Sequence, residues 1–395
     1  MWKIRRSPMV QAQHRSCWRG GWLALCLATL WLLFPLLARA ATVPMRVLLL
    51  QNISTLHVDV PPEYTILTDP AGLLAPEADG WRALHLHASR NRIRLHSPGI
   101  ELNDVRLKPR TRDAVIFVGG KLYRGGLEVK ARDNGLLVIN TLDLDEYLYG
   151  VLPQEAPVQW EMAALRAQAI VARTYALYKR KLNAHNDYDV SAHYLQDQRY
   201  DGYRAEHPRA TQAVDETRGL VLTCHGALIP AYYHAEAGGH TESSEYVWSS
   251  AHPCLRAVKA PIYPASPYLE WSVTLSLQDI RAALAKKGYS LGAIRHLQPL
   301  QRSPTGRIVL LKIIHTRGES VLRGVDFRLA LGPEVIRSTS FSVDIHGERA
   351  SFTGQGWGHG VGLCQWCSQG MAQLGYDHEA ILKHYYQGAD LIQYQ

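Results

Sequence analysis

Glu155, in the segment LPQEAP, has the residue type and the setting for acid–base chemistry. Prolines on both sides stiffen the backbone, and we expect a loop here that presents the carboxyl group just before a long helix. The competing interpretation is a carboxylate that only complements the positive end of that helix, whose dipole would lower the pKa of Glu155. Proton donation requires a raised pKa, so burial or apolar neighbours would have to outweigh the dipole.

Three further carboxylates lie upstream in the segment LDLDEYLYG: Asp143, Asp145 and Glu146. One of them could be the second carboxylate that an ordinary glycosidase needs. We interpret them instead as residues of a turn and a strand end. Glu155 is then the one well-placed candidate, which favours a reaction that uses a single acid–base group.

The histidines do not follow the pattern of a zinc-binding helix. His234 and His240 are six residues apart in HAEAGGH, and His378 and His384 are six residues apart in HEAILKH. A zinc-binding helix places two histidines four residues apart, so that both imidazoles share one face. The polar Gly-Gly turn after His234 has two interpretations, the wall of a site or an ordinary tight turn.

Cysteines are the remaining candidates for chemistry, and four lie beyond residue 40: Cys224, Cys254, Cys364 and Cys367. Zinc could gather them in space, but an even number of cysteines in an exported protein indicates disulfides. Among the three possible pairings we favour Cys224 with Cys254 and Cys364 with Cys367. We therefore predict no metal site and no cofactor.

Glycine occupies every second position from 354 to 362 in the stretch GQGWGHGVGLCQWC. Neither the G-x-G-x-x-G dinucleotide fingerprint nor the Gly-Lys-Ser/Thr of a P-loop is present. We predict a strand with one face bare of side chains, so that another backbone or a ligand can approach it closely. The opposite face would carry Trp357 and His359, and the stretch would form one wall of a binding groove.

The elements that must position these residues begin with a β-rich region. Apolar and alternating runs separated by turn residues predict strands from residue 45 to about 140. The basic segment 108–113 is a candidate boundary between two modules. Strand-like runs return after residue 219 and continue to the glycine-rich stretch.

Helices are predicted at three places. An alanine-rich pattern that starts at Pro157 predicts one long buried helix. Ser276 can cap a helix over 277–287, and two short helices are expected at the end of the chain. We expect an α+β fold, a β-rich mixed domain whose long buried helix and two short C-terminal helices form a groove.

The first 40 residues have the composition of a secretory signal. A basic start is followed by an uncharged apolar run from Gly20 to Leu37 and by the small residues of Ala38-Arg39-Ala40. The competing interpretation is an uncleaved membrane anchor, because the run is just long enough to span a bilayer. We predict cleavage after Ala40. The leader contains six basic residues and no acidic ones, so its removal lowers the formal net charge from +8 to +2, which argues against nucleic acid as a partner.

Four segments, in order, resemble the family of sporulation stage II protein D and the LytB amidase enhancer (SpoIID/LytB). They are LDLDEYLYGVLPQEAPVQWEMAALRAQAIVARTYAL, DQRYDGY, YYHAEAGGHTESSEYVW and GQGWGHGVGLCQWCSQGMAQLGYDHEAILKHYYQGADL. The resemblance covers residues 111–395 well and the β-rich start loosely. It implies a signal peptide at 1–40, an N-terminal β-rich module at 41–110 and a peptidoglycan-binding or catalytic domain at 111–395.

The resemblance also assigns residues by motif. The family's catalytic glutamate falls on Glu155, and Arg173 matches a family position important for activity. Substrate-binding roles are implied for Gln198 and Tyr200 in Q-x-Y-x-G, for Gly238, Gly239 and Thr241 in GG-x-T, and for His359 and Gln365 in GHGVG-x-x-Q. Trp357 is a further candidate, because aromatic rings stack on sugars.

Two departures from the family pattern limit what can be transferred. Some sporulation members carry a Cys/His zinc site just before Q-x-Y-x-G, but this chain has His185 and His193 there and no cysteine. The zinc site is therefore not expected. Cys367 stands where glycine is commoner, so the Cys-x-x-Cys pair would be peculiar to this branch.

The resemblance implies an exported protein that acts on peptidoglycan glycan strands. We expect a lytic transglycosylase in which Glu155 protonates the glycosidic oxygen between N-acetylmuramic acid and N-acetylglucosamine, and the muramic C6 hydroxyl closes a 1,6-anhydro end. The alternative is a glycan-binding enhancer of an N-acetylmuramoyl-L-alanine amidase that does not cut. Both place the protein in the periplasm or cell envelope, with the membrane contacted only through an uncleaved leader.

Overall fold

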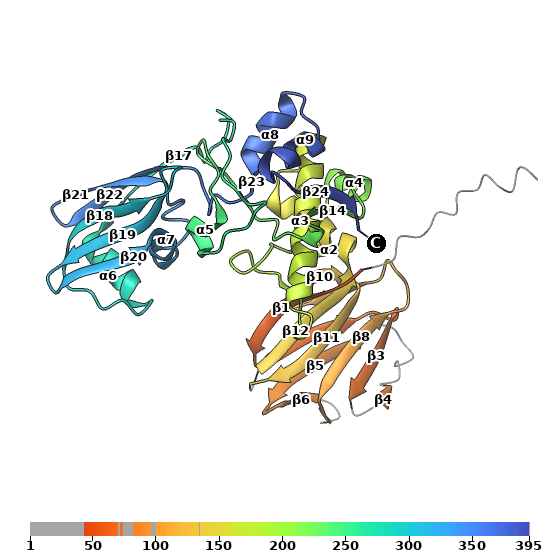
Figure 1. Ribbon diagram of the computed structural model, residues 1–395. Coiled ribbons are helices and arrows are strands. Elements are labelled where there is room, and N and C mark those ends of the chain that lie inside the picture. Colours follow the sequence, from red (N-terminus) through yellow and green to blue (C-terminus); the bar gives the residue numbers. More distant parts are fainter. Residues whose placement is uncertain (1–42, 70–71, 74–81, 96–99, 134, 395) are drawn as a thin grey trace, which may run out of the picture. The chain divides into compact units, whose positions relative to one another are not determined.

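The computed structural model describes residues 43–69, 72–73, 82–95, 100–133 and 135–394 (Figure 1). The signal peptide predicted at 1–40 lies outside these residues. None of the helices in the described ranges combines the length and apolar character needed to cross a membrane. The predicted α+β class is confirmed, since several β-sheets are combined with a long helix, α3 (Met162–Leu182), and other, shorter helices.

The β-rich start forms two sheets with strand orders β13-β1-β12-β11-β8-β3-β4 and β10-β9-β2-β5-β6-β7. Their bounds are β1 Pro44–Ile53, β2 Thr55–Val60, β3 Tyr64–Asp69, β4 Gly72–Leu73, β5 Arg82–Ser89, β6 Arg92–Leu95, β7 Glu101–Leu102, β8 Asp104–Pro109, β9 Val115–Val118, β10 Lys121–Arg124, β11 Gly126–Arg132, β12 Gly135–Asp143 and β13 Val190–Ser191. Alternate residues of β2 are buried, as expected of a strand with one face on a core. The core between residues 45 and 221 contains apolar side chains from both sheets.

The candidate boundary at 108–113 falls within these sheets. Strand β8 ends at Pro109 and pairs with β3 on one side and with β11 on the other. Residues before and after the boundary therefore belong to one hydrogen-bonded sheet and one core.

Two consecutive helices follow β12. The first, α2 (Leu144–Glu155), was not predicted, because Pro153 and the carboxylates of LDLDE were interpreted as turn residues. Asp143 accepts a hydrogen bond from the amide of Asp145 and caps this helix, and Pro153 lies in its last turn. The second helix is α3, which begins five residues after the predicted start at Pro157. Its alanine-rich stripe is buried, as predicted, and the helix contacts α2, α4 and the C-terminal helices.

The elements after α3 pack around it in a second core (Figure 1). They are β14 Leu220–Cys224, β16 Tyr233–His234, α5 Ser244–Trp248, β23 Leu363–Cys364, α8 Gln365–Gln373, α9 His378–Tyr385 and β24 Asp390–Gln393. Helix α4 (Pro208–Glu216) and strand β15 (Ala227–Leu228) also contact α3, but their side chains pack in the first core. Strand β16 pairs in parallel with β23, which joins the HAEAGGH segment to the end of the glycine-rich stretch. Both predicted C-terminal helices, α8 and α9, are present.

The segment that lies between α5 and β23 in the sequence forms a separate core. Its elements are β17 Glu270–Ser276, α6 Leu277–Ala285, β18 Ile294–Arg302, β19 Ile308–His315, β20 Gly318–Arg323, α7 Gly324–Leu331, β21 Phe341–His346 and β22 Arg349–Gln355. Ser276 caps α6, as predicted, by accepting a hydrogen bond from the amide of Asp279. The first and last strands, β17 and β22, pair along their whole length, so this segment leaves and rejoins the chain at neighbouring points.

Candidate functional site

Glu155 is the last residue of α2, and Ala156 behind it is already extended. The sequence-based expectation of a loop residue at the start of the long helix is therefore wrong. Glu155 lies at the C-terminal end of a helix, where the backbone dipole is negative and disfavours a carboxylate. The dipole of its own helix thus raises the pKa of Glu155, which is the opposite of the predicted direction.

The Glu155 carboxyl lies in a polar, partly enclosed environment. The residue is half-buried, and burial raises its pKa to about 7. Two hydrogen bonds oppose this shift, one from the backbone amide of Arg199 at 2.9 Å and one from the hydroxyl of Tyr233. A carboxyl group with a pKa near neutrality can both give and take a proton at physiological pH.

A layer of buried hydrogen bonds holds the Tyr233 hydroxyl in place. The side-chain amide of Gln198 donates to it at 3.3 Å and also to the backbone oxygen of Ala172 at 3.4 Å. The Gln198 oxygen accepts a hydrogen bond from Tyr147, which is fully buried on α2. Gln198, expected to bind substrate, is only 1 % exposed, so in this structure it supports the residues around Glu155.

A second carboxylate near these hydrogen bonds, that of Asp197, is already bound by other residues of the protein. Asp197 accepts a hydrogen bond from Tyr175 at 2.7 Å and forms an ion pair with Lys179 at 2.8 Å. It also accepts the backbone amide of Ser191 at 2.8 Å. These contacts hold the Asp197 carboxylate among protein groups, whereas Glu155 accepts hydrogen bonds only from the Arg199 amide and the Tyr233 hydroxyl among the described residues.

Gln365 and His359 hold the backbone of Glu155 and of Tyr233, respectively. The side-chain amide of Gln365 donates to the backbone oxygen of Glu155 at 2.9 Å. The His359 ring accepts the amide of Val361 at 3.0 Å and also hydrogen-bonds to the backbone of Tyr233. Burial, together with Arg328 and Arg307, lowers the pKa of His359 to about 3, so its ring is neutral.

The glycine-rich stretch is not the predicted strand with one bare face. Strand β22 ends at Gln355, and beyond it Gly356, Gly358, Gly360 and Gly362 all have positive φ. A Cβ on Gly362 would lie 2.0 Å from the backbone oxygen of Tyr232. The alternation therefore reflects a left-handed conformation at every second residue and close backbone contacts, rather than the pleat of a strand.

Arg173 is fully enclosed and bound by the protein. Its guanidinium pairs with Asp145 at 3.0 Å and donates to the backbone oxygen of Val214 at 2.9 Å. The side chain is 1 % exposed. In this structure Arg173 thus fixes α3 to the start of α2, and no hydrogen bond joins it to Glu155 among the described residues.

The other residues expected at the site have internal contacts. Tyr200 is buried and donates to the side-chain oxygen of Asn140 at 3.0 Å. Thr241 is buried and exchanges hydrogen bonds with the backbone of Val258. Gly238 and Gly239 have positive φ in the turn that Thr241 follows. These residues shape the backbone around the site.

Half-buried aromatic rings lie along the segments that flank Glu155. Trp366, next to Gln365, packs edge-on against Trp160 at 5.0 Å and stacks on Tyr263 at 6.0 Å. Trp357 contacts Tyr268 at 4.6 Å, with the Arg337 guanidinium 5.0 Å from its ring centroid. Aromatic faces of this kind suit contact with flat, polar ligands.

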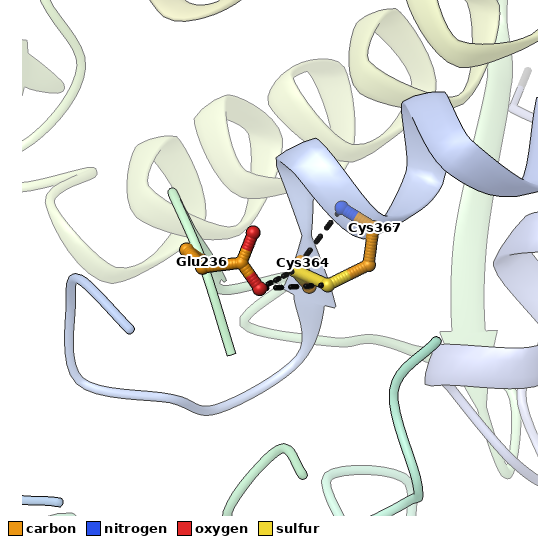
Figure 2. A group of neighbouring side chains, drawn as sticks. All are labelled: Glu236, Cys364 and Cys367. Atoms are coloured by element: carbon orange, nitrogen blue, oxygen red, sulfur yellow. Dashed lines mark hydrogen bonds between the residues drawn. A yellow bond between two sulfur atoms is a disulfide. The ribbon is translucent and has the colours of Figure 1, made fainter. Parts of the chain in front are cut away.

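Two disulfides are present, Cys224–Cys254 and Cys364–Cys367, which is the pairing favoured from the sequence. The second bridge lies at the start of α8, beside the carboxyl of Glu236 (Figure 2). These three residues are the only group of His, Cys, Asp or Glu ligands, among the described residues, close enough to hold a metal ion. With both sulfurs in a disulfide, they are not available as thiolate ligands.

The sequence analysis missed Tyr233, although it identified its neighbour His234. The chain contains 20 tyrosines, so tyrosine content alone does not single one out. The signal that could have found it is the motif itself, since Tyr233 begins the strand that leads into the Gly-Gly turn.

Comparison with known proteins identifies the family of this chain. Residues 132–224 match a family described as stage II sporulation protein, and residues 264–362 match a domain of unknown function (DUF8618). An uncharacterized protein of Brachyspira hyodysenteriae is 34 % identical over 75 % of this chain and 80 % of its own length.

Two named relatives cover much of the same region. The stage II sporulation protein D of Bacillus amyloliquefaciens is 31 % identical over 64 % of this chain and 75 % of its own length. An amidase enhancer of Bacillus subtilis is 28 % identical over 62 % of this chain and 40 % of its own length. The chain belongs to the SpoIID/LytB family, as the sequence motifs predicted.

Proposed function

We propose that this protein is a lytic transglycosylase of the cell envelope that cleaves peptidoglycan glycan strands, with Glu155 as its general acid and base. The observation that carries the proposal is the Glu155 carboxyl, half-buried and with a pKa of about 7. The family supports the substrate class, since a relative is named as an amidase enhancer and others as sporulation proteins.

The first half of the reaction uses the protonated form of Glu155. Its proton passes to the glycosidic oxygen between N-acetylmuramic acid and N-acetylglucosamine, and the bond to C1 breaks with oxocarbenium-like character. The carboxylate left behind accepts hydrogen bonds from the Tyr233 hydroxyl and the Arg199 amide. These two donors stabilise the carboxylate that forms in the reaction more than they stabilise the protonated carboxyl of the ground state.

The second half uses the same group as a base. The Glu155 carboxylate takes the proton of the muramic C6 hydroxyl, whose oxygen attacks C1 and closes the 1,6-anhydro ring. No second carboxylate and no attacking water are required. Asp197, the carboxylate that Tyr175 and Lys179 already bind, therefore has no direct role in the reaction.

Glycan contacts are assigned to Trp366, next to the Gln365 that bonds Glu155, and to Trp357, which shares the Tyr268 ring with Trp366. Trp366 and Trp357 are half-buried and offer ring faces for sugars. The remaining residues support the site by fixing its backbone. They are Arg173, Gln198, Tyr200, Thr241 and the Gly238–Gly239 turn. Gln365 positions Glu155 and His359 positions Tyr233, each through a hydrogen bond to the backbone.

The test incubates the mature protein with glycan strands stripped of peptides and detects anhydro-muramic ends by mass spectrometry. We expect Glu155→Gln to lose activity by at least about 100-fold. Glu161→Gln is the matched control, because Glu161 is exposed and caps α3 without a side-chain hydrogen bond. This variant should keep wild-type activity.

The competing function is a glycan-binding enhancer of an amidase, favoured by the enhancer among the relatives. A wild-type protein that binds glycan strands in a pull-down assay but releases no product would replace the proposed transglycosylase by this enhancer. Equal loss of activity in Glu155→Gln and Glu161→Gln would contradict the assignment of Glu155.

A further inference from the structure

The disulfide Cys364–Cys367 lies against a buried carboxyl group that the glycan chemistry does not use. Cys364 caps α8, and Cys367 lies in its first turn. Figure 2 shows the carboxyl of Glu236 pointing at the bridge, with its Oε1 3.3 Å from the sulfur of Cys367 and 3.8 Å from that of Cys364. All three residues are completely buried.

Glu236 is poorly satisfied while the bridge is intact. Its Oε2 has no close hydrogen-bond partner among the described residues, and the carboxyl otherwise receives the Gly238 amide at 3.3 Å together with the Ser266 hydroxyl and the Ala237 amide. Burial raises the pKa of Glu236, although Ser266 and the amides of Gly238 and Ala237 favour the charged form. A disulfide carries no hydrogen, so neither sulfur can donate to this carboxyl group.

The two sulfur atoms have different surroundings. The sulfur of Cys364 receives the backbone amides of Ala237 and Cys367, each at 3.3 Å, at the N-terminal end of α8. Both features stabilise negative charge on Cys364. The sulfur of Cys367 instead lies closest to Glu236, a position that suits a protonated thiol hydrogen-bonded to the carboxylate.

We propose that Cys364 and Cys367 are a redox-active pair that is reduced by an external dithiol, with Glu236 as the proton donor to Cys367. A buried, incompletely hydrogen-bonded carboxyl group is costly in a protein interior. A role as proton donor explains why this carboxyl group is buried here, because reduction of the bridge forms a Cys367 thiol that donates a hydrogen bond to Glu236.

The reaction proceeds by two exchanges. A thiolate of the dithiol attacks the sulfur of Cys364, the Cys364–Cys367 bond breaks, and Cys367 leaves with the electron pair and takes the proton of Glu236. The second thiolate then attacks the reductant's sulfur in the mixed disulfide, and Cys364 leaves as a thiolate. The dithiol has given two electrons to the pair and its two protons to solvent, and it ends as a cyclic disulfide.

Access requires a small reductant or a local opening, because both sulfurs are buried. The neighbouring glycine-rich stretch makes backbone contacts with the segment that carries Glu236, including hydrogen bonds between Glu236 and Trp357. Separation of this stretch from Glu236 would expose the bridge without unfolding the rest of the chain.

The redox state of the pair can reach Glu155 through one residue. Gln365, between the cysteines, donates to the backbone oxygen of Glu155 at 2.9 Å. Breaking the bridge moves the sulfurs from bonding to van der Waals separation, and a close-packed interior passes such a shift to its neighbours. An effect of reduction on glycan cleavage rests on the proposed function, but reduction of the pair does not.

The test measures reduction of each bridge directly and does not depend on glycan cleavage. Native protein is incubated with dithiothreitol, alkylated at intervals and digested, and peptide mass spectrometry gives the reduced fraction of each cysteine pair. Glu236→Gln cannot donate the proton, and we expect it to slow reduction of Cys364–Cys367 by about 10-fold or more. The rate at Cys224–Cys254 in the same sample should not change.

Two controls separate proton donation from loss of structure. In concentrated guanidinium, wild type and Glu236→Gln should lose both bridges at equal rates, since the carboxyl is then remote from the sulfurs. Faster loss of Cys224–Cys254 in the native variant would report a loosened fold and would contradict a specific effect. Equal native rates at Cys364–Cys367 in the two proteins would also overturn the proposal, as would stoichiometric zinc binding by the reduced pair.

Discussion

At the scale of single residues, the chemistry depends on where Glu155 lies in its helix. Burial is the main cause of its raised pKa, and the negative end of α2 acts in the same direction. The Tyr233 hydroxyl and the Arg199 amide oppose both effects without cancelling them. The result is a carboxyl group that exchanges a proton near neutral pH, whereas Asp197 nearby is held by Tyr175 and Lys179.

The pH dependence of glycan cleavage should report this carboxyl. Because the first step needs protonated Glu155, we expect kcat/KM to fall as the pH rises through about 7. Tyr233→Phe removes a hydrogen bond that favours the ionised form, so it should move this descending limb to higher pH. A profile measured from pH 5 to 9 checks both shifts, and a limb that moves to lower pH in Tyr233→Phe would contradict the role given to Tyr233.

The same pKa predicts a change in stability. The folded-state pKa of Glu155 is raised from 4.5 to about 7, so the stability it contributes is present below pH 4.5 and is lost as the pH rises to about 7. Glu155→Gln removes the ionisable group. We expect it to be more stable than wild type at pH 8, by on the order of 1–3 kcal/mol, and similar at pH 4. Urea unfolding at the two pH values measures this difference, and a less stable variant at pH 8 would contradict the raised pKa.

At the scale of elements, α2 and α3 form the support of the site. Asp145 in the first turn of α2 binds Arg173 of α3 and also Arg218, with both pairs near 3 Å. This contact fixes the relation between two helices, of which α2 ends at Glu155 and α3 begins at Met162 after the segment that contains Trp160. Breaking it should weaken the fold before it changes the chemistry.

Arg173→Met should therefore destabilise the protein by about 3 kcal/mol, because it leaves a buried carboxylate with one fewer cation. Adding Asp145→Asn should recover part of that loss, since the uncompensated charge is removed. Urea unfolding of the single and double variants tests this. The opposite result, unchanged stability with weaker glycan binding in Arg173→Met, would give Arg173 the substrate-binding role implied by the sequence motif.

The glycine-rich stretch allows a matched pair of substitutions. Gly362 and Gly239 both have positive φ, but a Cβ on Gly362 would collide with the Tyr232 backbone, whereas one on Gly239 would meet nothing within 4 Å. Gly239→Ala should cost about 1–2 kcal/mol from its backbone conformation alone. Gly362→Ala should cost clearly more. Equal unfolding free energies for the two variants would show that the close backbone contact is unimportant.

Among the elements, the sequence predicted the strands and helices that leave a clear pattern of residues. Strands β1, β2, β5 and β12, helix α6 and the buried stripe of α3 follow from alternation, caps and alanine spacing. Helix α2 was not predicted, because Pro153 was interpreted as part of a stiff loop, whereas in the structure it lies in the last turn of this helix. A glycine period of two fits both a bare strand face and alternating left-handed residues, and only the structure distinguishes them.

The same limit applies to the site. Motifs predicted Glu155, Gln198 and Gln365, which the structure brings together around one carboxyl group. They did not indicate that Arg173 and Thr241 would be buried and hydrogen-bonded by the protein itself. Burial depends on the packing of α3 against distant segments, which the motifs do not record.

At the scale of the whole chain, the site combines segments far apart in sequence. Glu155 and Tyr233 precede the segment 264–362 and Gln365 follows it; this segment has a core of its own and matches a distinct family. The sequence analysis kept this segment within one domain over 111–395. The paired ends β17 and β22 explain how so long a segment can leave residues 234 and 363 adjacent.

The most direct measurement of the central claim is the mass of the product ends formed in water labelled with oxygen-18. If Glu155 serves as acid and then base, purified protein should release glycan fragments that end in 1,6-anhydro-muramic acid and contain no label. Labelled reducing ends would show hydrolysis by an activated water and would contradict the transglycosylase mechanism. The absence of any product from glycan strands that the protein binds would contradict catalysis by Glu155 itself.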